Sequence, residues 1–150
     1  MKYLFSKNNE DYTVIVGCGR LGANLANTLS DSGGSIIVID KNPDAFRKLS
    51  PSYGGIAMTG DATEMNVLNN AEIEKATTVI SVTNKDNTNI MVAQLAKEMF
   101  STRQVIARLY DPECECVYRE FDIDTICPAV LSAKEIDKLL GASETEDEAI

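Results

Sequence analysis

A glycine-rich hexapeptide between a buried strand and an amphipathic helix constrains the fold of this chain most strongly. Residues 13–16 (Thr-Val-Ile-Val) are uncharged and mostly β-branched, as in a strand buried on both faces. Residues 17–22 then have the sequence Gly-Cys-Gly-Arg-Leu-Gly, and apolar residues recur at helical spacing over 21–29. The pattern predicts a strand, a tight turn open to phosphate, and a helix whose first amides favour an anion.

A carboxylate at the end of the second predicted strand extends this pattern. Residues 35–40 form an apolar run that ends in Asp40, at the separation expected for a residue that accepts hydrogen bonds from an adenosine ribose. A carboxylate there repels the 2′-phosphate of NADP, and Lys41 does not clearly compensate. We therefore expect an adenosine with a free ribose. The alternative is a structural turn beside a solvated aspartate, which the combined spacing disfavours.

Strands and helices alternate along the rest of the chain. Four further short apolar runs predict strands, at residues 56–59, 78–82, 105–109 and 125–127. This alternation predicts an α/β fold: a Rossmann-like doubly wound parallel sheet of about six strands with helices on both faces. We expect Thr63 to cap the helix that follows the third strand. Residues 132–135 (Ser-Ala-Lys-Glu) have the form of a capping box that opens a C-terminal helix with an apolar stripe.

Length and charge narrow the function classes. The chain has 150 residues, the size of one domain, and a net charge of −9, which disfavours binding to nucleic acid or anionic lipid. No apolar run approaches a membrane span and no secretory signal is evident, so we expect a cytoplasmic protein. We expect a leader at 1–11, a nucleotide-binding domain at 12–140 and an acidic disordered tail at 141–150.

Cysteine and histidine content bears on metal and redox chemistry. The chain has four cysteines and no histidine, and their spacing matches none of the usual zinc sites. We therefore expect no metal site and mostly packed, reduced cysteines. Cys18 is a candidate redox thiol, because a nearby helix start lowers the pKa of a thiol.

Polar residues gather at the carboxyl ends of several predicted strands. Ligands of open parallel sheets bind beyond these ends, near the point where the strand order reverses. A single polar residue at a strand end often only leads into solvent, but convergence of several in one crevice is harder to explain that way. Besides the glycine turn, the converging residues are Asp40, Asp61, Thr83, Asn84 and Arg108.

With these residues assembled, the chain resembles the nucleotide-binding domains known as RCK, KTN or TrkA-N, which regulate potassium conductance. The resemblance covers roughly residues 11–140. Its motifs are Gly17-Cys18-Gly19-Arg20-Leu21-Gly22 with its internal arginine, Asp40, Gly60-Asp61-Ala62-Thr63, Thr83-Asn84 with Asp86 and Asn87, and Ala107-Arg108. The internal arginine and the Gly-Asp-Ala-Thr string are not general Rossmann features, so the combination is specific.

The resemblance implies a site for an adenine nucleotide: ATP, ADP, AMP or NAD(H). The implied binding residues come from each strand end. They are the turn residues Gly17, Cys18, Gly19, Arg20, Leu21 and Gly22 at the phosphates, Asp40 at the ribose, Lys41 at the edge of the adenosine pocket, Asp61 and Ala62 at the adenine, Thr83 and Asn84 by the ribose and phosphates, and Arg108 reaching the crevice.

The resemblance also implies a partner. The expected function is that of a cytoplasmic regulatory subunit of a potassium uptake system, peripheral to the inner face of the membrane through a channel or transporter subunit. Family members form homodimers or larger rings, and residues 132–140 resemble the crossover helix that exchanges between protomers. Members usually continue into a second, smaller lobe, whereas here the sequence ends in an acidic tail. We therefore expect a stand-alone regulator, a split regulator whose other lobe is a separate chain, or a truncated chain.

An NAD-dependent oxidoreductase is the alternative from another class. Its glycine fingerprint is the same, but hydride transfer needs a substrate pocket and usually an acid or base beside it. The chain has no histidine, and Tyr53 and Tyr110 stand in no recognisable catalytic pair. We therefore expect no catalytic residues and a function based on binding.

Overall fold

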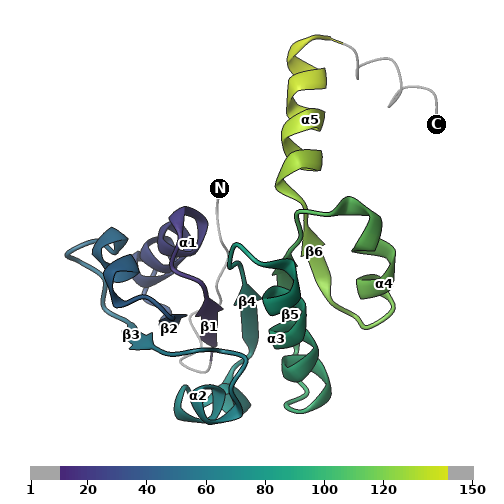
Figure 1. The fold of residues 1–150 in the computed structure, drawn as a ribbon. Helices are drawn as coiled ribbons and strands as arrows, with labels where there is room; N and C mark the ends of the chain where they lie inside the picture. Colours follow the sequence, from purple (N-terminus) through teal and green to yellow (C-terminus); the bar gives the residue numbers. More distant parts are fainter. Residues whose placement is uncertain (1–10, 142–150) are drawn as a thin grey trace.

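Six parallel strands form the centre of the structure, a computed structural model that describes residues 11–141 (Figure 1). The strands are β1 (Tyr12–Val16), β2 (Ser35–Asp40), β3 (Ile56–Thr59), β4 (Thr78–Ser81), β5 (Gln104–Arg108) and β6 (Asp124–Ile126). Their order is β3-β2-β1-β4-β5-β6, so the strand order reverses between β1 and β4. The predicted doubly wound parallel sheet is confirmed. Nearly all of the expected leader and acidic tail lies outside the described residues.

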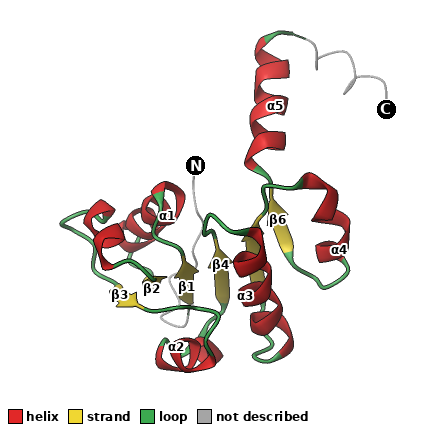
Figure 2. Cartoon of the chain, viewed as in Figure 1, coloured by secondary structure: helices red, strands yellow, loops and turns green. Residues whose placement is uncertain are grey.

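Helices cover both faces of this sheet (Figure 2). The α-helices are α1 (Arg20–Asp31), α2 (Met65–Asn70), α3 (Asp86–Glu98), α4 (Glu115–Arg119) and α5 (Pro128–Leu139). Three short 3-10 helices lie in the segments between these elements: η1 (Pro43–Lys48), η2 (Ile73–Lys75) and η3 (Pro112–Cys114). In the part of the chain that the structure describes, no helix is both long enough and apolar enough to cross a bilayer.

The alternation of side chains along β1 divides the core into two layers. Val14 packs on one face with Leu68 of α2 and Val92 of α3, and all three side chains are fully buried. Ile15 points to the other face, where it packs with Ala26 of α1. Successive residues of a strand face opposite sides, so a run without charged side chains is what a doubly covered strand requires. This arrangement places the start of α1 above the end of β1.

A close backbone contact fixes α1 against the glycine turn. A Cβ added to Gly22 would lie 1.7 Å from the carbonyl oxygen of Gly17, so the helix reaches this position only because residue 22 has no side chain. Gly17 itself has φ +101°, and a Cβ there would lie 2.9 Å from the amide nitrogen of Thr83. Gly19 differs, because a Cβ added there would meet nothing within 4 Å. The first and last glycines of the motif thus pack the protein, and the middle one faces open space.

Two predicted helix starts are wrong. Thr63 does not cap α2: its hydroxyl and its amide both donate to the carboxylate of Asp61, and Glu64 occupies the N-cap. The proposed capping box at 132–135 lies inside α5, which begins at Pro128 after Cys127. A proline at the first helical position already has the φ angle of a helix, and this starts α5 before Ser132 is reached.

Helix α5 extends away from the sheet after β6 (Figure 1). None of its residues is buried, although it carries the apolar side chains of Leu131, Ile136 and Leu139. Leu139 is 81% exposed, and Leu140, directly after the helix, is 76% exposed. The described chain thus presents an apolar helix that its own sheet does not cover.

Replacement of Gly22 and, separately, of Gly19 by alanine tests the packing account. We expect Gly22→Ala to lower the free energy of unfolding by about 3 kcal/mol or more, because the new Cβ overlaps a backbone carbonyl that cannot move freely. Gly19→Ala should lower the free energy of unfolding by about 1 kcal/mol, because alanine is less favourable than glycine at an N-cap. Urea denaturation followed by circular dichroism measures both. Equal destabilisation by the two variants would contradict the account.

Candidate functional site

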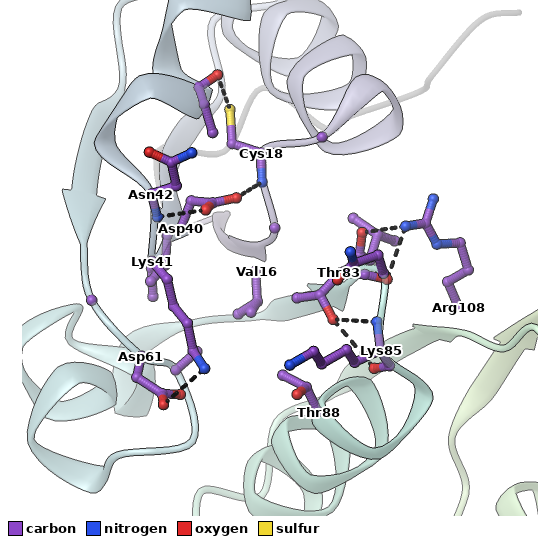
Figure 3. Close-up of a pocket in the computed structure, with 18 of the residues that line it drawn as sticks. Val16, Cys18, Asp40, Lys41, Asn42, Asp61, Thr83, Lys85, Thr88 and Arg108 are labelled. Carbon is purple, nitrogen blue, oxygen red and sulfur yellow. Dashed lines mark hydrogen bonds and ion pairs between the residues drawn. The ribbon is translucent and has the colours of Figure 1, made fainter.

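A cavity of about 340 Å³ lies at the carboxyl ends of the central strands (Figure 3). Ligand pockets of proteins enclose roughly 300–1,000 Å³, so this one has room for a small ligand. It opens where the strand order reverses between β1 and β4, the position at which open parallel sheets bind ligands. Figure 3 shows Asp40, Lys41 and Asp61 on one side of the cavity and Thr83, Lys85 and Thr88 on the other.

Most of the predicted site residues line this cavity. Those that do are Gly17, Cys18, Gly19, Asp40, Lys41, Asp61, Ala62, Thr83, Asn84 and Arg108. Three predicted residues do not line it: Arg20, Leu21 and Gly22, which lie in the first turn of α1. Gly22 instead packs the helix against the turn. The sheet thus gathers residues from five strand ends into one crevice.

Asp40 ties the glycine turn to the loop after β2. Its Oδ2 accepts a hydrogen bond from the amide of Cys18 at 2.8 Å, and its Oδ1 accepts one from the amide of Asn42 at 2.9 Å. An ionised carboxylate has about four lone-pair sites, so both oxygens can still accept hydroxyl donors from a ligand. Asp40 therefore holds the pocket wall and presents an acceptor to the cavity at the same time.

The start of α1 lies next to Gly19 on the cavity wall and leaves its first backbone amides uncapped. Gly19 occupies the N-cap, no side chain caps the helix, and its first turn holds no acidic residue. The first amides of a helix lack partners within it and carry the positive end of the helix dipole. Because Gly19 has no side chain and faces open space, an anion can approach these amides closely.

The charges that line the cavity are mainly positive. Four cationic side chains line it, namely Lys41, Lys48, Lys85 and Arg108, against two carboxylates, Asp40 and Asp61. This local excess stands within a chain whose net charge is −9. Such an excess inside an acidic protein favours an anionic ligand at this place over the rest of the surface.

Lys41 and Asp61 form an ion pair at one edge of the cavity. The Lys41 Nζ lies 3.2 Å from Asp61 Oδ2, and the Lys41 side chain is 62% exposed. The hydroxyl and then the amide of Thr63 hold the pKa of Asp61 below its ordinary value, and Lys41 adds to this effect. Asp61 therefore remains ionised at neutral pH. Its oxygens are fixed by its own loop rather than free to move.

Arg108 anchors the opposite wall. Its Nη2 donates to the carbonyl oxygens of Val82 at 2.9 Å and Thr83 at 2.8 Å, and its guanidinium lies 5.3 Å from the ring centroid of Tyr110. The Arg108 side chain thus reaches from β5 to the segment that follows β4. Its charge lines the cavity, while one of its nitrogens already binds backbone.

The expectation of a low pKa for Cys18 is wrong. Its side chain is fully buried, and the Sγ contacts the carbonyl oxygen of Ala45 at 3.6 Å. Burial raises the pKa of the Cys18 thiol, and the neighbouring carboxylate of Asp40 raises it further. The side chain points into the core below α1 rather than toward the free amides, so the helix start does not activate it. In residues 11–141 no group of three or more potential metal-ligating side chains is gathered.

Sequence reasoning missed several polar residues that line or support the cavity. Asn42, Lys48, Lys85 and Thr88 line it, and Asn89 lies buried behind its wall. Lys85 and Thr88 follow the fourth strand closely, so their position after a strand end was a usable signal. Lys48 lies at the end of η1, where no local pattern marks which way a side chain points.

Comparisons with known sequences and structures show what the chain is similar to. The model of the TrkA-N domain family matches residues 13–128. The chain is 38% identical over 135 residues to the Trk system potassium uptake protein TrkA of Streptomyces coelicolor. The aligned region covers 90% of this chain and 60% of that protein. The chain thus spans about 60% of the length of this curated relative.

Two solved structures of GsuK share the fold. The GsuK RCK domain superimposes with a TM-score of 0.76 at 26% identity, covering 94% of this chain and 30% of that one. A structure of GsuK bound to ADP gives a TM-score of 0.75 at 26% identity, covering 92% and 36% of the two chains. The family match spans most of the chain and the fold agrees with it. The chain therefore belongs to the TrkA-N family of nucleotide-binding domains, the RCK domains of potassium channels and Trk transporters.

Proposed function

We propose that this chain is the nucleotide-binding regulatory domain of a potassium uptake system, and that its crevice binds an adenine nucleotide. The observation that carries the proposal is the crevice itself. It combines an uncapped helix start behind an open Gly19 with an acceptor, Asp40, at the next strand end. It also concentrates positive charge in an acidic chain. Together these features suit a ligand with a phosphate at one end and ribose hydroxyls at the other.

The lining suggests a pose for the ligand. Phosphates lie against the amides that follow Cys18, where Lys85 supplies positive charge from the far wall. The ribose hydroxyls donate to Asp40, and the adenine lies toward Asp61 and Ala62. The Lys41 side chain borders this end, where its pair with Asp61 narrows the opening.

The class of nucleotide follows from what these residues contact. They recognise the AMP half that ATP, ADP, AMP and NAD(H) share, and GsuK has been solved with ADP. NADP is disfavoured, because its 2′-phosphate would face the Asp40 carboxylate. Regulation rather than catalysis is supported by the absence of histidine from the chain.

The proposed mechanism is a population shift in an assembly with a membrane partner. A nucleotide that binds two conformations of a dimer with different affinity moves the equilibrium between them, and a membrane potassium channel or transporter subunit responds. We place the domain at residues 12–140, on the cytoplasmic side of the membrane.

The exposed face of α5 supports a homodimer as the unit of this assembly. Ile136, Leu139 and Leu140 lie close to one another around the helix axis and are exposed. Exposed apolar stripes of this kind usually mark a protein interface. A second copy of the same helix offers a matching apolar stripe, as twofold contacts require.

Calorimetric titration with AMP, ADP, ATP, NADH and NADPH tests the nucleotide site. We expect the first four to bind and NADPH to bind weakly or not at all. Asp40→Ala should weaken ADP binding by at least about tenfold, because it removes a charged acceptor from the ribose and the anchor of the Cys18 amide. Asp44→Ala is the matched control, since this carboxylate is exposed outside the cavity and should change binding little. Binding confined to NADH would instead favour an oxidoreductase.

Sedimentation velocity tests the proposed dimer. The wild-type chain should sediment as a dimer or larger ring at micromolar concentration, and Ile136→Asp combined with Leu139→Asp should sediment as a monomer. Lys134→Asp places a new carboxylate on the opposite side of α5 and should leave the assembly intact. A wild-type monomer, or an assembly that survives the double substitution, would contradict a role for this helix face.

A further inference from the structure

We propose that Asn89 is a positioning residue of the nucleotide site: its side-chain amide holds Thr83 and Arg108 in the binding arrangement. The inference rests on the proposed function, because it names the residue that keeps one wall of that site in place. Asn89 lies in α3, is fully buried and does not itself line the cavity. Its effect on a ligand must therefore pass through the residues that it contacts.

One amide group makes five hydrogen bonds here. The Asn89 Oδ1 accepts from the amide of Thr83 at 2.8 Å, from the Thr83 hydroxyl at 2.7 Å and from the Ser81 hydroxyl at 3.2 Å. The Nδ2 donates to the carbonyl oxygen of Thr83 at 3.0 Å and to that of Arg108 at 2.9 Å. The side chain thus connects the end of β4 to the end of β5.

The chemistry of these partners fixes the orientation of the amide. A peptide N–H only donates and a carbonyl oxygen only accepts, so Oδ1 must face the Thr83 amide and Nδ2 must face the two carbonyls. The Thr83 carbonyl also accepts from Arg108 Nη2, which occupies its second lone pair. Thr83 is therefore held through its amide, its hydroxyl and its carbonyl. These contacts leave the wall little freedom to shift.

The surroundings argue against Asn89 as an ordinary core residue. Its helix buries Val92, Ala93 and Ala96 against the sheet, and an apolar residue at position 89 would suit that face. Burial of an amide is tolerated only when its hydrogen bonds are satisfied. All five bonds go to residues at the ends of β4 and β5, and Thr83 and Arg108 both line the cavity. The buried amide thus stabilises residues of the site.

Asn89→Asp tests the proposal with the smallest change of shape. The substituted carboxylate keeps the acceptor for Thr83 and Ser81 but places an oxygen against the two carbonyls. We expect the folded variant to bind ADP about tenfold more weakly than the wild type, measured by calorimetry below its unfolding temperature. The ratio of the two affinities should approach one as the pH falls. Burial raises the pKa of the new carboxyl, and its protonated form donates to a carbonyl again.

Asn87→Asp is the matched control. It makes the same chemical change two residues earlier on α3, at an exposed position outside the cavity lining. The ADP affinity of Asn87→Asp should stay within about twofold of that of the wild type. The ratio of these two affinities should not change with pH. A merely structural role for Asn89 would lower the unfolding temperature of Asn89→Asp while leaving the ADP affinity of the folded variant unchanged. That result would overturn the inference.

Hydrogen exchange of the wild-type protein provides a test that needs no variant. The Thr83 amide should exchange slowly in the free protein, because Asn89 accepts its hydrogen bond inside the core. Exchange at the rate of an unprotected amide would overturn the inference even if Asn89→Asp fails to fold. Absence of ADP binding to the wild type would contradict the proposed function and this inference with it. Equal ADP binding by wild type and Asn89→Asp would contradict the inference alone.

Discussion

The backbone contact between α1 and the glycine turn is the constraint on which the rest of the structure depends. Gly22 lies so close to the carbonyl of Gly17 that no side chain fits between them, and this closeness sets where α1 begins. The helix start then lies at the end of β1, where the strand order reverses. Asp40 completes the arrangement from β2 by binding the Cys18 amide. The same packing requirement thus places the helix start where the proposed anion site lies.

The two walls of the crevice are built by different physical means. The wall of β1 and β2 depends on backbone geometry, since the glycine turn supplies amides and Asp40 supplies the acceptor. The wall of β4 and β5 depends on side chains that bind backbone, because Arg108 and Asn89 both donate to the Thr83 carbonyl. A ligand that spans the two walls would sense any change in their separation. This property suits a domain that reports nucleotide binding to a partner.

The sequence predicted those features of the fold and the site that depend on residues close together in the chain. The glycine spacing, the apolar strands and Asp40 at a strand end each follow from short-range chemistry, and the sheet and most of the crevice lining agree with them. The helix starts at Thr63 and Ser132 were wrong because a competing local partner, Asp61 or Pro128, decided the geometry. The redox alternative for Cys18 fails because its thiol turns into the core, which the sequence does not show. Asn89 was missed because the three residues that it binds, Ser81, Thr83 and Arg108, meet only once β4, α3 and β5 are assembled.

A crystal structure of the chain with ADP tests the central claim most directly. The account predicts phosphate oxygens at the amides that follow Cys18, the ribose hydroxyls at Asp40, and Thr83 still bound to Asn89. Density for ADP elsewhere on the protein, or an empty crevice at saturating ADP, would contradict the account.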